Sequence, residues 1–442
     1  MAVLTLSQFY DTLFPRNYEK VMRIFMPAAK TYGNIIKKIA PEHKTAAFRM
    51  IKAGLHLEKF RTGHFLDKKI PDAYQYLNNY AIGNVLEALQ RPEQTAWVNI
   101  FTPVEILQCF DLYCLSAEAL SSYLSGFYIE DSLIDHAESE GIASTLCSYH
   151  KTFIGAIDSG IIPPAAFATT TSMICDGNVN TFRHLSQKHH VPCYMLDIPN
   201  DYSPDALHYV VDQLEKMIQM LEQKFGKKMD LQRLSEILER ENLSKEYYHK
   251  FLLETSHKDY PSTLTLQMFM LFATHLIIGT PEMLRFFQQL YEEAKAAPEF
   301  HGKKILWVHL YPYYQETLQQ YFNLKDDYQL ITTEMNLDYM EPLDTTRPLE
   351  ALAKKMLCNV YNGSYDRKAR MVSDLATELH ADGVINFCHW GCKQSSGGVM
   401  LLKDEIKKTG IPFLSLDGDG MDRRNSHDGQ IKTRLEAFLE LL

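Results

Sequence analysis

The sequence has few cysteines and no compact cysteine motif. Eight cysteines are scattered over 442 residues, and no C-x-x-C-x-x-C run is present. A long chain with so dispersed a set does not depend on a disulfide framework, which is typical of short secreted domains. Some of the eight thiols are therefore available as ligands of a metal group.

An excess of positive charge is also missing. The formal net charge is −10, and the lysines and arginines are dispersed along the chain. Because nucleic-acid backbones are bound by basic surfaces, we expect no nucleic-acid partner. The first residues lack the pattern of a secretory leader, and no later window holds about 18 uninterrupted apolar residues. We therefore expect a cytoplasmic protein without membrane contact.

What is present is a globular composition on a long chain. The hydrophobic share is 46% and the charged share is 23%, close to the averages of soluble domains. A chain of 442 residues is long enough for two or three domains with separate cores.

The periodicity of apolar residues divides the chain into four regions. Residues 1–95 and 205–300 have apolar positions every three or four residues and few strand signals, which predicts helices. Between them, AWVNIF, LYCLSAE, ATTTSMICDG and VPCYMLDIP are short β-rich runs alternating with helical stretches. The predicted regions are a helical N-terminal region (1–95), a first α/β domain (96–204), a helical spacer (205–300) and a second α/β domain (301–442).

The second α/β region repeats the plan of the first. In both, a strand runs into a cysteine, a helix follows, and a proline-containing strand ends near an aspartate, Asp197 or Asp417. The economical fold is α/β, with two Rossmann-like parallel-sheet domains, an N-terminal helical region and a helical spacer. Ligands of open parallel sheets bind at the carboxyl ends of the strands, where Cys175 and Cys392 are predicted to lie.

Three cysteines are candidates for an iron–sulfur site. Cys175 and Cys392 occupy matching strand ends, and Cys147 precedes a helix just upstream of the first. Three cysteine ligands on a [4Fe–4S] cluster leave one iron open to a substrate oxygen. On spacing alone, the same pattern suits three small buried residues equally well.

Several ordered segments resemble the 2-hydroxyacyl-CoA dehydratase and benzoyl-CoA reductase family. LCSYHKTFIGA, ICDGNVNTF and VPCYMLDIPND resemble its upstream cysteine motifs, and WVHLYP resembles the start of its second domain. The stretch from HWGCKQSSGG to TRLEAFLELL resembles its C-terminal signature, in which a cysteine precedes a helix and a Gly-Ile-Pro strand leads to an aspartate. The resemblance runs from about residue 97 to the end.

The resemblance implies a function. Family members bind one oxygen-sensitive [4Fe–4S] cluster per subunit, and the matching positions are Cys147, Cys175 and Cys392. They remove water from a 2-hydroxyacyl-CoA thioester through a ketyl radical, after an ATP-dependent iron–sulfur activator protein has delivered one electron. The implied partners are this activator, the acyl-CoA and a homologous second subunit, in a heterodimer or a homodimer.

Two further residues are candidates for chemistry at this site. Glu118 ends the predicted strand LYCLSAE and matches a glutamate that the resemblance implicates in acid/base work. His389 lies in the predicted loop with Cys392, where it can donate a hydrogen bond to a cluster sulfide or to the substrate, although a loop histidine is often simply exposed. Glu105, in the first turn of a predicted helix, suits a structural role near the helix dipole.

The chain departs from the family pattern at specific places. Ile100 stands where the catalytic dehydratase subunits carry a serine. The additional cysteine that the double-cubane branch carries before its proline–glutamate motif is absent, which favours a single cubane. Cys388 is expected to be a core residue at the strand end, but a contribution of either Cys388 or Cys358 to the cluster is left open.

Three other functions compete with the dehydratase, the last of them a metal-free binding module that has kept the α/β architecture without a cluster. The first is a reductase of the same fold, which transfers electrons to an aromatic or other unsaturated acyl-CoA. The second is an electron-relay subunit of such a complex. The identity of the acyl group is not encoded in any motif that we identify.

Overall fold

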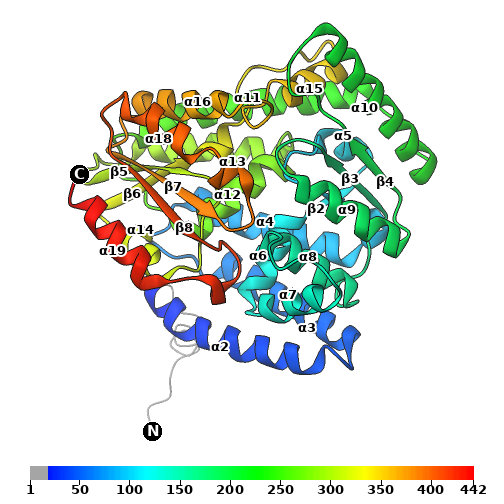
Figure 1. The fold of residues 1–442 in the computed structure, drawn as a ribbon, viewed down its shortest axis with the longest axis horizontal. Helices are drawn as coiled ribbons and strands as arrows, with labels where there is room; N and C mark the ends of the chain where they lie inside the picture. Colours follow the sequence, from blue (N-terminus) through cyan, green and yellow to red (C-terminus); the bar gives the residue numbers. More distant parts are fainter. Residues whose placement is uncertain (1–17) are drawn as a thin grey trace.

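The computed structural model describes residues 18–442, so the part of the predicted helical region that falls on residues 1–17 lies outside the described chain. The described part of that region is helical, as predicted. It consists of α2 (Tyr18–Ile39), α3 (Lys44–His64) and α4 (Asp72–Gln90). Figure 1 shows α2 and α3 running along one edge of the molecule.

Two four-stranded parallel sheets form the centre of the fold (Figure 1). The strands of the first are β1 (Thr95–Val98), β2 (Tyr113–Ser116), β3 (Phe167–Thr171) and β4 (Cys193–Leu196). Those of the second are β5 (Lys303–Val308), β6 (Tyr328–Thr333), β7 (Gly383–His389) and β8 (Phe413–Gly418). The prediction of two parallel-sheet units is confirmed.

Both sheets have the same topology. The first has the order β2-β1-β3-β4 and the second has the order β6-β5-β7-β8. In each sheet the strand order reverses between two neighbouring central strands, β1 and β3 in the first sheet and β5 and β7 in the second. Ligand crevices form at such topological switch points. Cys175 follows β3 and Cys392 follows β7, so both lie at switch points.

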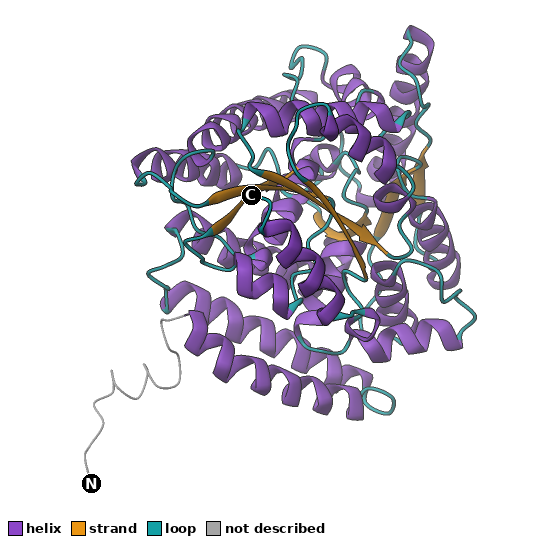
Figure 2. Cartoon of the chain, turned by 60° about the vertical axis from the view of Figure 1, so that its left-hand side comes forward, coloured by secondary structure: helices purple, strands orange, loops and turns teal. Residues whose placement is uncertain are grey.

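Helices cover both sheets, and Figure 2 shows them enclosing the strands. All residues of β1, β3 and β7 are buried, as expected for parallel strands covered on two faces. The helices of the first unit are α5 (Val104–Cys109), α6 (Ala117–Gly126), α7 (Glu130–Ser139), α8 (Ser148–Asp158) and α9 (Asp176–His189). Those of the second are α14 (Glu316–Phe322), α15 (Pro348–Leu357), α16 (Tyr365–Glu378), α17 (Lys393–Ser396), α18 (Val399–Lys407) and α19 (Asp428–Leu439).

Four helices occupy the predicted spacer. They are α10 (Pro204–Phe225), α11 (Leu231–Thr255), α12 (Leu264–Leu276) and α13 (Pro281–Ala296). The boundaries of α10 follow from its sequence, because the Ser203 hydroxyl caps its first turn, Pro204 occupies the first position and Gly226 ends it in the left-handed region. The apolar α12 packs against α4, β2 and β6, and so contacts both units.

The structure corrects the predicted elements at three places. The strand in LYCLSAE ends at Ser116, and Glu118 lies in the first turn of α6, because the Ser116 hydroxyl accepts the Ala119 N–H and starts a helix there. His389 belongs to β7, although the sequence suggested a loop, and the strand includes Cys388 as a buried residue. The elements from α14 to α16 were not anticipated, because no motif marks residues 311–382.

Two tryptophans occupy equivalent core positions. Trp97 of β1 and Trp307 of β5 are both fully buried. Trp97 packs edge-on against Phe153, and Trp307 stacks on Tyr311. In the part of the chain that the structure describes, no helix is both long and apolar enough to cross a bilayer.

Candidate functional site

The three candidate cysteines occupy equivalent positions in the local fold. Cys147, Cys175 and Cys392 each stand directly before the first residue of a helix, namely α8, α9 and α17. The positive ends of the longer helices α8 and α9 favour a thiolate at that position. None of the three is in a disulfide.

The structure brings these three thiols together from both α/β units. Burial raises the pKa of Cys147 well above its ordinary value, and the neighbouring Cys392 and Cys175 thiols raise it further. Burial and the neighbouring Cys392 raise the pKa of Cys175 to about 12. Cys147 and Cys175, whose ionisation is opposed by burial and by neighbouring thiols, are suited to a cationic group that would compensate the charge of their thiolates.

Gly391 allows the close approach of the two units. Its φ is +81°, and a Cβ atom at this position would lie 2.7 Å from the Cys147 backbone nitrogen. Only glycine fits such a contact without displacing backbone. The loop that carries Cys392 therefore rests directly on the chain at Cys147.

A histidine lies beside each of the three thiols. The Nε2 atom of His389 is 3.1 Å from the Cys147 Sγ. The corresponding distances are 3.5 Å from His309 to Cys392 and 3.7 Å from His150 to Cys175. All three imidazoles are buried, and burial lowers their pKa values.

The sequence analysis identified His389 but missed the other two histidines. His389 is 1% exposed at the end of β7, so the alternative of an exposed loop residue is wrong. His150 follows Cys147 by three residues, on the first turn of α8. His309 directly follows β5, whose carboxyl end lies beside that of β7. The position of His309 directly after a predicted strand was the signal that could have identified it.

Buried ionisable groups fix the backbone at His309. This residue has a φ of +79°, and its N–H donates to Glu334 Oε2 at 2.7 Å. The other oxygen of Glu334 pairs with the buried Lys368 Nζ at 2.9 Å and accepts the Tyr361 hydroxyl. This network stabilises the left-handed backbone conformation of His309 next to Cys392.

Glu118 lies close to the cysteines on the first turn of α6. It is 7% exposed, and its Oε2 atom has no hydrogen-bond partner. Burial raises its pKa to about 7, against the opposing effect of hydrogen bonds in its own turn and of His275. Its charge in turn raises the pKa of Cys175. A carboxyl group with such a pKa can both accept and release a proton near neutral pH.

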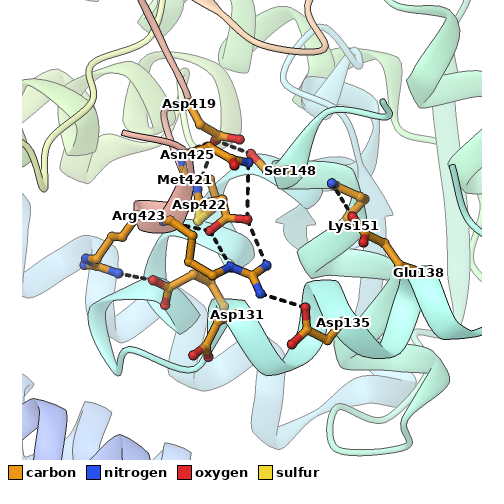
Figure 3. A network of polar contacts seen from close by, with 12 residues as sticks. Asp131, Asp135, Glu138, Ser148, Lys151, Asp419, Met421, Asp422, Arg423 and Asn425 are labelled. Atoms are coloured by element: carbon orange, nitrogen blue, oxygen red, sulfur yellow. Dashed lines mark hydrogen bonds and ion pairs between the residues drawn. The ribbon is translucent and has the colours of Figure 1, made fainter. Parts of the chain in front are cut away.

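The loop after β8 meets Ser148 at the start of α8 and so joins the two units, as Figure 3 shows. Asp419 Oδ1 accepts the Ser148 hydroxyl at 2.5 Å and the backbone N–H of Met421 at 2.8 Å. Arg424 pairs with Asp422 and, in the first unit, with Asp135 at 2.7 Å. These contacts fix the loop against α7 and α8.

The remaining cysteines lie elsewhere in the fold. Cys388 is buried in β7 and hydrogen-bonds to Ser415 at 3.2 Å. Cys358 caps the C-terminal end of α15, where its electrostatic neighbours are Lys354, Glu341 and Arg367. The other three lie in α5, β2 and β4, and they are Cys109, Cys114 and Cys193.

The donor set differs from that of a single-ion site. Within residues 18–442, no three histidine, cysteine or acidic side chains converge as the ligands of one metal ion would. The thiolates of an iron–sulfur cluster bind different irons and therefore stand further apart. Three free thiols without acidic ligands match the soft donors that such clusters require.

Comparison with known proteins gives relatives along most of the chain. Residues 99–442 match the family model of the 2-hydroxyglutaryl-CoA dehydratase D-component. The (R)-phenyllactyl-CoA dehydratase alpha subunit of Clostridium sporogenes is 24% identical over 403 residues, which cover 85% of this chain and 96% of the relative. A benzoyl-CoA reductase subunit of Thauera aromatica is 25% identical over 378 residues, which cover 76% of this chain and 86% of the relative.

The family match begins at Asn99, directly after β1, and includes the other three strands of the first sheet, the whole second sheet and all three candidate cysteines. The resemblance inferred from sequence motifs is thereby confirmed. The chain belongs to the 2-hydroxyglutaryl-CoA dehydratase D-component family.

Proposed function

We propose that this chain is a subunit of an (R)-2-hydroxyacyl-CoA dehydratase that holds one oxygen-sensitive [4Fe–4S] cluster through Cys147, Cys175 and Cys392. The observation that carries the proposal is the meeting of three free thiols from two α/β units, with Cys147 buried and Cys175 and Cys392 partly buried. Relatives that are alpha subunits of (R)-phenyllactyl-CoA and (R)-2-hydroxyisocaproyl-CoA dehydratases support it.

The residues of this chain would prepare the site for dehydration. When bound, the cluster would supply the one-electron chemistry that makes loss of the hydroxyl group feasible. Glu118 would accept the proton released from the substrate, since its pKa of about 7 lets it change protonation near neutral pH. Burial of Glu118 and of the three histidines excludes bulk water from the reacting atoms.

A cavity against α6 and α12, the helices that carry Glu118 and His275, supports an acyl-thioester as the substrate. It has a volume of about 1140 Å³, and its wall includes Ser122 of α6 and Phe272 of α12. One helical turn further along the same two helices lie Glu118 and His275. The cavity therefore shares α6 with the candidate acid/base.

The proposed enzyme needs two protein partners. Several relatives are named alpha subunits, which supports a second, homologous subunit beside this chain. A small ATP-dependent iron–sulfur activator would deliver the electron.

A reductase or an electron-relay subunit is the second candidate. Ile100, which stands in place of the catalytic serine, is 4% exposed and cannot bind a substrate oxygen through its side chain. The similarity to a subunit of benzoyl-CoA reductase supports the reductase. Product analysis separates the two enzymes, because dehydration consumes no net electrons whereas reduction does.

The cluster is tested by metal analysis after anaerobic purification. We expect about four irons and four sulfides per chain, and a loss of most of this iron in Cys147→Ser, Cys175→Ser and Cys392→Ser. Cys388→Ser is the matched control, because Cys388 is buried near the same loop but bonds to Ser415. It should keep its iron.

Two results would contradict the assignment. One is protein without iron after anaerobic reconstitution, and the other is equal iron loss in the Cys388→Ser control.

A further inference from the structure

The hydrogen bonds of His389 define which ring nitrogen carries its proton. The backbone N–H of Gly420 donates to His389 Nδ1 at 2.9 Å. A nitrogen that accepts a hydrogen bond has no proton of its own, so the proton of the neutral ring is on Nε2. Nε2 is the atom 3.1 Å from the Cys147 Sγ, and His389 therefore donates to this sulfur.

The surroundings leave the ring no other orientation. Asp419 is 3.8 Å from Nδ1, but its Oδ1 atom already accepts hydrogen bonds from Ser148 and from two backbone N–H groups. The Tyr149 ring packs edge-on against the imidazole at 5.3 Å, and its hydroxyl donates to the Gly420 carbonyl. The loop that carries Gly420 is itself fixed to α7 and α8 by the network in Figure 3.

The other two histidines are held less strictly. The Nδ1 atom of His150 contacts the Thr181 hydroxyl at 3.1 Å, and a hydroxyl can either donate or accept. The Nδ1 atom of His309 is buried without a hydrogen-bond partner. Only at His389 does a backbone donor assign the proton to the nitrogen that faces the sulfur.

We propose that His389 is a positioning residue whose Nε2–H, directed at Cys147, raises the reduction potential of the cluster. This inference rests on the proposed function and deepens it. Reduction adds negative charge to the cluster and its thiolates, and a directed donor stabilises that charge in a buried site. Removal of the donor disfavours the reduced state without removing a ligand.

The test compares midpoint potentials of the anaerobically reconstituted chain, followed by electron paramagnetic resonance. We expect His389→Phe, which keeps a ring against Tyr149 but has no donor, to lose about tenfold in the equilibrium constant of one-electron reduction, equivalent to a shift of about −59 mV. His389→Gln retains an N–H donor and should recover part of the shift. His427→Leu, an exposed residue after the same loop, should match the wild type.

A second measurement needs no variant. In the reduced wild-type chain with ¹⁵N-labelled histidine, we expect a hyperfine-coupled ¹⁵N nucleus with an exchangeable proton, in electron–nuclear double resonance. Absence of this coupling in iron-loaded wild type overturns the inference, and so does an unchanged midpoint in His389→Phe with full iron. Wild type that binds no iron overturns the proposed function as well, so the two failures are distinguishable.

Discussion

Glu118 is buried, and its Oε2 atom has no hydrogen-bond partner. Such an environment raises the free energy of the ionised carboxylate. Burial raises its pKa from 4.5 to about 7. Between these pH values the folded chain binds a proton that the unfolded chain has released. The free energy of unfolding contributed by this group therefore falls as pH rises from 4.5 to 7, and the penalty is complete above pH 7.

Glu118→Gln should accordingly stabilise the cluster-free chain by about 1–3 kcal/mol at pH 8 and have little effect at pH 4. Urea unfolding at the two pH values measures this difference. Glu215→Gln, an exposed change on α10, is the control and should show no such pH dependence. A Glu118→Gln chain that is less stable at pH 8 than at pH 4, relative to wild type, would contradict the assigned pKa shift.

At the scale of elements, a buried ion cluster joins α5, α11 and α15. The Lys355 Nζ of α15 lies 2.6 Å from Glu105 and 2.7 Å from Glu241. Burial raises the pKa of Glu105 to about 7, whereas Lys245 and Lys355 overcome burial and lower the pKa of Glu241. The structural role of Glu105 therefore includes an ion pair with Lys355, which no local sequence pattern predicts.

Lys355→Met should destabilise the fold by about 3–5 kcal/mol, because it leaves the buried Glu105 without its cation and Glu241 with Lys245 alone. Lys354→Met is the matched control. Lys354 is the preceding residue, half exposed and paired with Glu341 at the surface, so its loss should cost about 1 kcal/mol or less. Chemical denaturation of both variants measures the difference, and equal midpoints would show that the buried cluster adds nothing to stability.

At the scale of the whole molecule, the candidate site depends on contact between the two α/β units. Gly391 of one unit touches the backbone at Cys147 of the other. The loop from Asp419 to Asn425 adds ion pairs and hydrogen bonds between the same units.

Gly391→Ala should weaken this contact although it removes no candidate ligand. We expect a larger loss of stability than in Gly410→Ala, by about 1–3 kcal/mol, together with a lower iron content after reconstitution. Gly410 has a similar φ of +78° but open space around its Cβ position, so it controls for backbone strain alone. If both variants unfold at the same denaturant concentration and retain equal iron, the close approach has no role in assembling the site.

The sequence by itself determined the fold class and the positions of Cys175 and Cys392 at strand ends, because alternation of strands and helices predicts parallel sheets and the strand-end positions come with them. It indicated the family through the resemblance of several ordered motifs. Only the tertiary structure decided which groups meet. His309 and His150 come beside cysteines because β5 pairs with β7 and because α8 packs on α9. Such pairings bring residues that are distant in sequence together, and no local periodicity encodes them.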